Sequence, residues 1–325
     1  MMNWTDENIV FVISLPRSGS TLLQRILSIH PSICTTSETW LLLPQIYTLK
    51  ENCVFSEYNA TAASRALSDL CEYIDKGQDV YKMLIKRHFI DMVQRTADRN
   101  QTIFVEKTPR NNLIIEDIYN LFPESKYIFL WRNPAAVVAS MINSFSNGKW
   151  NIYRQEIDLY KGLDNMIRSN KLKIKNRLDI RYEDLVHEPR KHTSEIIKFI
   201  GLRDGISIEC MSNNSLTGRM GDKTGINRYN SVSTKSVNNW TDTYCNVLRR
   251  KWLKNYLKYI GNNNMSNMGY NREKILNELR KQNNNKHIYS DALRMLYGVI
   301  DRNYHVSVIR KLRKARIYKR KYMLQ

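Results

Sequence analysis

The chain has 325 residues, of which 42% are hydrophobic and 25% charged, and its formal net charge at pH 7 is +20. This composition allows a large packed core, and the absence of any run of ~18 apolar residues excludes a transmembrane helix in the sequence. The five cysteines include no Cys-x-x-Cys pair, which disfavours a disulfide framework and a zinc site. The first residues lack the basic start and cleavage site of a signal peptide, and we predict a cytoplasmic protein.

The excess of positive charge is partly concentrated near the C-terminus. The basic residues there are Arg310, Lys311, Arg313, Lys314, Arg316, Lys319, Arg320 and Lys321. Such runs are usually solvated, which favours a solvated helical tail. A docking surface for an acidic partner or for anionic lipid headgroups is the alternative. We expect no nucleic-acid partner, because no aromatic-interleaved basic motif or known nucleic-acid module occurs.

The first element in chain order is a strand over residues 9–13, a continuous apolar and β-branched run typical of a strand buried on both faces. Residues 16–20 interrupt this run, and from Thr21 apolar residues recur at helical spacing. Residues 41–100 also have a helical pattern, and we expect them to cover one side of the functional site.

Three further strands are predicted over residues 102–105, 127–131 and 178–182, and helices follow the last two. Asn133 and Pro134 have the residue types of a helix start, and Gly201 that of a helix end. Strands that alternate with helices predict an α/β fold with a central parallel sheet flanked by helices. Ligands of such folds bind at the carboxyl ends of the strands.

The C-terminal third begins with a Gly-, Ser- and Asn-rich stretch over residues 205–240, which indicates a loop that can fold over a ligand. A helix is predicted over residues 238–260, with a break at 262–264. We predict a domain over residues 1–265 and a basic helical C-terminal extension over 266–325 that packs on the domain or trails from it.

The loop after the first strand has the geometry of a phosphate-binding loop without being a Walker A motif. In the register G-x-x-x-x-G-K-[ST], residues 14–21 keep Gly19 and Thr21, but Ser20 replaces the lysine needed for ATP chemistry. Backbone N–H groups and the helix start can still bind a phosphate, and Arg17 adds a forked cation. An ordinary turn between strand and helix is the alternative interpretation.

Three segments, in this order, resemble motifs of the PAPS-dependent sulfotransferases (PAPS is 3′-phosphoadenosine 5′-phosphosulfate). Residues 16–23 are similar to the family's 5′-phosphosulfate loop, and residues 132–141 to its 3′-phosphate motif. Residues 181–185 resemble a segment whose tyrosine, here Tyr182, lies against the adenine. The similarity covers about residues 8–260, and Arg17 resembles the arginine of the bacterial and tyrosylprotein-type branch.

This resemblance implies a P-loop-like three-layer fold and a metal-free transfer of a sulfuryl group from PAPS to an acceptor hydroxyl. PAPS carries two anionic groups a nucleoside apart and therefore needs two anion sites. The implied donor-binding residues are Arg17, Ser18, Gly19, Ser20, Thr21, Arg132, Ser140, Tyr182, Arg228 and Ser231. Tyr182 as a purely structural core aromatic remains an open alternative.

The resemblance also implies the residues that act in catalysis. Glu38 matches the general base of the tyrosylprotein branch, and Lys107 matches a lysine that contacts the transferring sulfuryl group. Arg17 would stabilise the leaving phosphate, and Thr224 falls near a serine that assists the transition state. One departure is Asn230, which aligns with a lysine of that branch; Arg228 can replace it. A solvated loop carboxylate is the alternative for Glu38.

A P-loop-like nucleotide kinase or nucleotide-binding protein is the main alternative function. The missing Gly-Lys step at residues 19–20 and the lack of a strand-end aspartate for Mg²⁺ disfavour it. The acceptor is left open by the sequence among a peptide tyrosine, a sugar, a lipid and a natural-product alcohol.

Overall fold

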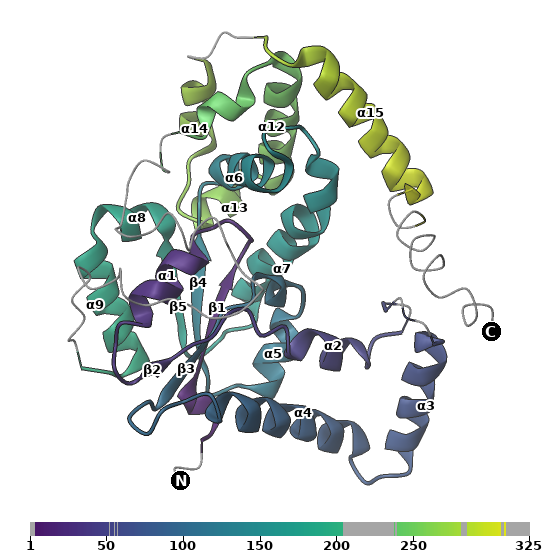
Figure 1. The fold of residues 1–325 in the computed structure, drawn as a ribbon, viewed down its shortest axis with the longest axis vertical. Coiled ribbons are helices and arrows are strands. Elements are labelled where there is room, and N and C mark those ends of the chain that lie inside the picture. The colour runs from purple at the N-terminus through teal and green to yellow at the C-terminus, as the bar shows by residue number, and fades with distance from the viewer. Residues whose placement is uncertain are drawn as a thin grey trace.

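A computed structural model describes residues 4–51, 53–54, 56, 58–203, 237, 239–280, 285–306 and 309. At its centre lies a five-stranded parallel sheet with the strand order β2-β3-β1-β4-β5 (Figure 1). The strands are β1 (Ile9–Ser14), β2 (Ile33–Cys34), β3 (Ile103–Glu106), β4 (Lys126–Trp131) and β5 (Arg177–Arg181). The predicted α/β fold with a parallel sheet is therefore confirmed, and the predicted strands differ from the observed ones by a residue at either end.

Helices cover both faces of the sheet. The α-helices are α1 (Ser20–Leu27), α2 (Leu42–Tyr47), α3 (Ala60–Glu72), α4 (Gly77–Gln94), α5 (Ile115–Leu121), α6 (Pro134–Ser146), α7 (Leu163–Arg168), α8 (Tyr182–His187), α9 (Pro189–Ile200), α12 (Val247–Ile260), α13 (Asn262–Asn267), α14 (Arg272–Arg280) and α15 (Ile288–Tyr304). Three short helical turns also matter below: η2 (Pro109–Leu113), η3 (Ile152–Gln155) and the π-helical η4 (Ile157–Gly162).

Strand β1 shows why two helical layers form. Its side chains alternate between two apolar clusters, with Phe11 and Ile13 in one and Val10 and Val12 in the other. The first cluster is closed by α2, α4–α7 and α12–α14, and the second by α1, α8 and α9. A strand buried on both faces needs an apolar residue at every position, which explains its uninterrupted sequence.

The predicted helix ends are partly correct. Asn133 caps α6 by accepting a hydrogen bond from the Ala135 N–H at 3.0 Å, and Gly201 ends α9 at φ 85°. The break predicted at 262–264 is wrong, because those residues lie in α13. The interruption is one residue earlier, at Gly261, where φ 81° and ψ 154° favour glycine.

The described residues after 265 pack on the rest of the domain. Ile275, Leu276 and Leu279 of α14 lie in the larger apolar cluster, and Asp291 of α15 pairs with Arg249 of α12 at 2.6 Å. The domain boundary at 265/266 stays a prediction. The basic run 310–321 lies outside the described residues. Among the helices that the structure describes, none is long and apolar enough to cross a membrane.

Candidate active site

The loop between β1 and α1 is shaped by two residues with left-handed backbone conformations. Arg17 has φ 71° and Gly19 φ 94°. A Cβ atom on Gly19 would lie 2.2 Å from the ring of Tyr182, so both the backbone and the close packing require glycine. Helix α1 begins at Ser20 without a side-chain cap, and its first N–H groups are oriented to bind an anion.

The three motifs that are far apart in the sequence meet around this loop. Arg132, which follows β4, donates a hydrogen bond from Nη1 to the Arg17 carbonyl oxygen at 2.7 Å. Its guanidinium carbon lies 4.4 Å from the centroid of the Tyr182 ring. The Arg17 Nε donates to Ser140 Oγ on α6 at 3.2 Å. Two cations and a hydroxyl therefore surround the loop, as an anion site requires.

Tyr182 lies beneath this arrangement, at the start of α8. Its side chain is 0% exposed, between Gly19 and the Arg132 guanidinium group. In this position it supports the phosphate-type loop. Its contact with adenine stays a prediction.

Glu38 comes from the segment between β2 and α2, and both of its carboxylate oxygens have partners. Oε1 lies 3.2 Å from Lys107 Nζ, and Oε2 accepts a hydrogen bond from Trp40 Nε1 at 3.0 Å. The Lys107 side chain is 2% exposed and that of Glu38 13%. The ion pair between Glu38 and Lys107 is thus largely withdrawn from water, and the carboxylate is held in one orientation.

Glu106, the last residue of β3, is hydrogen-bonded to the segment that carries Glu38. Its Oε2 accepts from Thr39 Oγ1 at 2.9 Å, and its Oε1 accepts from Asn111 Nδ2 at 3.2 Å. Burial raises the pKa of the Glu106 carboxyl group, although Thr39, Asn111 and Lys107 oppose this shift. Glu106 was not among the residues predicted from the sequence.

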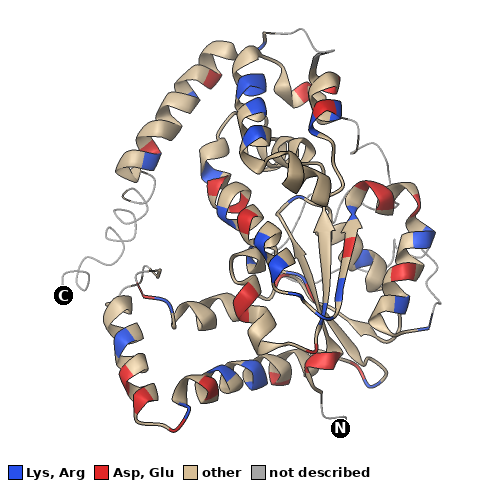
Figure 2. Ribbon diagram, turned by 180° about the vertical axis from the view of Figure 1, so that it is seen from behind, with Lys and Arg blue, Asp and Glu red and all other residues tan. Residues whose placement is uncertain are grey.

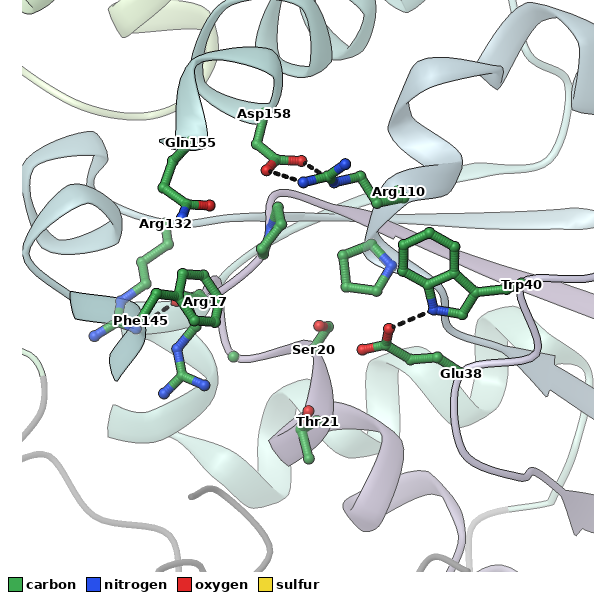
Figure 3. Close-up of a pocket in the computed structure, with 13 residues that line it drawn as sticks. Arg17, Ser20, Thr21, Glu38, Trp40, Arg110, Arg132, Phe145, Gln155 and Asp158 are labelled. Carbon is green, nitrogen blue, oxygen red and sulfur yellow. Dashed lines mark hydrogen bonds and ion pairs between the residues drawn. The ribbon is translucent and has the colours of Figure 1, made fainter. Parts of the chain in front are cut away.

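A cavity of about 290 Å³ joins the loop to Glu38 (Figure 3). Its lining includes six of the residues predicted from the sequence: Arg17, Gly19, Ser20, Thr21, Glu38 and Arg132. Figure 3 shows Ser20 and Glu38 on the same side of this cavity, with Arg17 further along the loop. Ser18, Lys107, Ser140 and Tyr182 are not among the lining residues. Thr224, Arg228, Asn230 and Ser231 lie outside the described residues.

The other wall of the cavity contains residues that the sequence did not reveal. Arg110 of η2 forms a two-point ion pair with Asp158 of η4, at 2.7 Å from Nε to Oδ1 and 2.9 Å from Nη2 to Oδ2. Burial raises the pKa of Asp158, and Arg110 opposes the shift. Trp40, Pro109, Phe145 and Gln155 also line the cavity, with Trp40 next to Glu38 and Phe145 next to Arg17. Their types indicate a largely apolar subsite with a few polar groups, as ligand pockets commonly have.

A sequence model of the sulfotransferase family matches residues 9–204 of this chain. This range contains the loop after β1, Glu38, Lys107, Arg132, Ser140 and Tyr182. The chain belongs to the sulfotransferase family.

Relatives of this sulfotransferase-family chain include bacterial and animal proteins. This chain is 31% identical over 135 residues to the nodulation protein NoeE of Sinorhizobium fredii, and the match covers 41% of this chain and 30% of NoeE. It is 24% identical over 254 residues to a putative protein-tyrosine sulfotransferase of Caenorhabditis briggsae, covering 75% of this chain and 85% of that protein. The chain therefore spans about a third of the length of NoeE but most of the length of the putative protein-tyrosine sulfotransferase.

The same family is found among solved structures. The sulfotransferase domain from the curacin biosynthetic pathway superposes with a TM-score of 0.51 at 24% sequence identity, covering 72% of this chain and 90% of that domain. This similarity confirms the predicted P-loop-like fold of the sulfotransferases.

Proposed function

We propose that the chain transfers a sulfuryl group from PAPS to an acceptor hydroxyl by in-line displacement. The observation that carries this proposal is the shared cavity, in which an anion-binding loop and a lysine-paired carboxylate line one space. Membership of the sulfotransferase family supports the donor and the type of reaction.

The residues of the loop fit the phosphosulfate end of the donor. Backbone N–H groups at the start of α1, the Arg17 guanidinium group and the hydroxyls of Ser20 and Thr21 provide positive and hydrogen-bonding groups at the cavity. Arg132 and Ser140 would form the second anion site, for the 3′-phosphate. The donor supplies a sulfuryl group bonded to a phosphate, which is a good leaving group.

Glu38 would act as the general base. As the acceptor oxygen forms its bond to sulfur, the Glu38 carboxylate takes the hydroxyl proton, and the bond between sulfur and the phosphate oxygen breaks. Lys107 holds the Glu38 carboxylate in its orientation, and its ammonium group would contact the transferring sulfuryl group. Arg17 would balance the charge that develops on the leaving phosphate.

The acceptor and the cellular setting are inferred more coarsely. The names of the relatives point to different acceptors or roles. One is a nodulation protein, one a putative protein-tyrosine sulfotransferase and one an omega-hydroxy-beta-dihydromenaquinone-9 sulfotransferase. We therefore infer a hydroxyl-bearing acceptor without choosing its class. A cytoplasmic location, a bacterial-type enzyme and an acidic partner of the basic tail remain predictions.

A thermal-shift comparison tests the proposed donor. PAP, the desulfated product of PAPS, should raise the melting temperature, because a ligand that binds the native state stabilises it. Stabilisation by Mg-ATP without stabilisation by PAP would instead favour a nucleotide kinase. Transfer from radiolabelled PAPS into a cell extract, followed by mass spectrometry of the product, would then identify the acceptor.

A further inference from the structure

Helix α15 has an apolar outer stripe that no part of the described chain covers. The stripe consists of Tyr289, Leu293, Leu296, Ile300 and Tyr304, and these side chains are between 40% and 87% exposed. Their spacing of four, three, four and four residues places them on one face of the helix. Large exposed apolar patches on a folded protein commonly mark interaction sites.

Three of the four charged residues of α15 make polar contacts with the domain. Asp291 pairs with Arg249, Arg294 donates from Nη1 to Asn151 Oδ1 at 3.2 Å, and Arg302 donates from Nε to Glu156 Oε2 at 3.1 Å. A surface helix normally buries its apolar face and exposes its charges. Here these polar contacts, together with Tyr297 against Tyr153 and Met295 against the core, hold the helix to the domain, and the stripe itself contains no charged residue.

Basic groups border the stripe. Leu293 lines a hollow of about 380 Å³ between η3 and α15 together with Arg154 and Arg294. Helix α12, which packs beside α15, exposes Lys251, Lys254 and Lys258 on its outer side. Figure 2 shows a row of basic residues along α12, next to the sparsely charged α15. The stripe therefore lies in a positively charged neighbourhood on a protein whose net charge is +20.

We propose that this face, formed by the α15 stripe and the adjacent basic groups, docks on an anionic membrane surface. A helix lying in the membrane interface buries apolar side chains at the boundary of headgroups and acyl chains, and neighbouring Lys and Arg residues bind the anionic headgroups. The two tyrosines near the ends of the stripe, Tyr289 and Tyr304, suit the headgroup level. A second copy of the chain is disfavoured as the occupant, because two strongly positive surfaces repel each other.

Co-sedimentation with lipid vesicles tests this proposal on the full chain. Wild-type protein should sediment with phosphatidylcholine vesicles that contain about 30% phosphatidylglycerol, and more weakly with phosphatidylcholine alone or at high salt. The double variant Leu293→Glu/Leu296→Glu should lower the partition coefficient by about tenfold or more, because two apolar contacts are lost and two negative charges gained.

The control variant Leu70→Glu/Leu84→Glu makes the same change at exposed leucines of α3 and α4 and should bind like wild type. A third variant, Ile300→Gln, weakens the stripe without adding charge and should lower binding severalfold. An unchanged PAP-induced thermal shift in all variants would show that the fold and the donor site are intact.

Three results would overturn the proposal. They are no sedimentation of the wild type with anionic vesicles, an equal loss of binding in the two double variants, and a wild-type dimer that only the α15 variant converts to a monomer. The last result, measured by light scattering after gel filtration, would assign the stripe to an interface between two copies.

Discussion

Glu38 is held by two donors, and this makes its proton-accepting role open to a clean test. Glu38→Gln keeps the shape of the side chain and a hydrogen bond to either partner, but the amide has no basic carboxylate. Radiolabel transfer from PAPS should fall by about 10²- to 10⁴-fold, the usual contribution of a general base, while the PAP-induced thermal shift persists. Glu273→Gln, at an exposed position of α14, is the matched control. Undiminished transfer would remove Glu38 from this role.

Glu106 gives a second prediction at the scale of a single residue. Burial raises its pKa in the folded protein above the ordinary value of 4.5. The contribution of Glu106 to stability is therefore fully present below that ordinary value and is lost as the pH rises toward the raised value. Between acid and neutral pH, the free energy of unfolding of wild type should decline relative to that of Glu106→Gln, measured by urea denaturation. Parallel pH profiles of the two proteins would contradict the prediction.

Individual site residues were predictable where a motif fixes them and not where the fold alone brings them together. Arg17, Gly19 and Thr21 follow a buried strand in one short segment, so the local pattern revealed them. Arg110 and Asp158 are 48 residues apart, and their pairing depends on the π-helical turn η4. No sequence pattern indicated that turn, so the second wall of the cavity was missed.

At the scale of elements, the junction of β1 and α1 depends on Gly19. Gly19→Ala should destabilise the protein by about 1–2 kcal/mol for the left-handed backbone, and by a further ~1–3 kcal/mol for the overlap with Tyr182. Gly201→Ala is the matched control, because φ is 85° there and no atom lies within 4 Å of the added Cβ. Equal losses of unfolding free energy in urea would show that the Tyr182 contact is unimportant.

Elements with a strong local signal were the most predictable, whereas the long helix predicted over residues 238–260 begins only at Val247, after a 3-10 turn at Thr241–Tyr244. The four apolar strand segments and the capped start of α6 could be located because each has a strong local signal. Strand β2 has two residues, too few to show a pattern, and its pairing with β3 comes from the tertiary fold. The break near residue 262 was misplaced because the three asparagines, although weak helix formers, continue as α13 after Gly261.

At the scale of the whole molecule, the ion pair between Arg249 and Asp291 joins the C-terminal helix to the domain. Both side chains are buried, and Arg249 also donates to the carbonyl oxygens of Thr243 and Gly148. Asp291→Ala should lower the free energy of unfolding by about 3–5 kcal/mol, because it leaves a buried cation without its partner. Arg302→Ala, which removes a more exposed pair with Glu156, should cost about 0–1 kcal/mol. Comparable losses for the two variants in denaturant titrations would contradict this ranking.

The contacts among Arg17, Arg132 and Tyr182 have a consequence for chimeric proteins. The Arg132 guanidinium group hydrogen-bonds to the loop's backbone and also packs against the Tyr182 ring. The Tyr182 ring in turn leaves room for glycine alone at position 19. The three motifs are thus one interlocked part, although more than a hundred residues separate the first from the second. A loop transplanted from a distant relative should work only when its partners after β4 and β5 are transplanted with it.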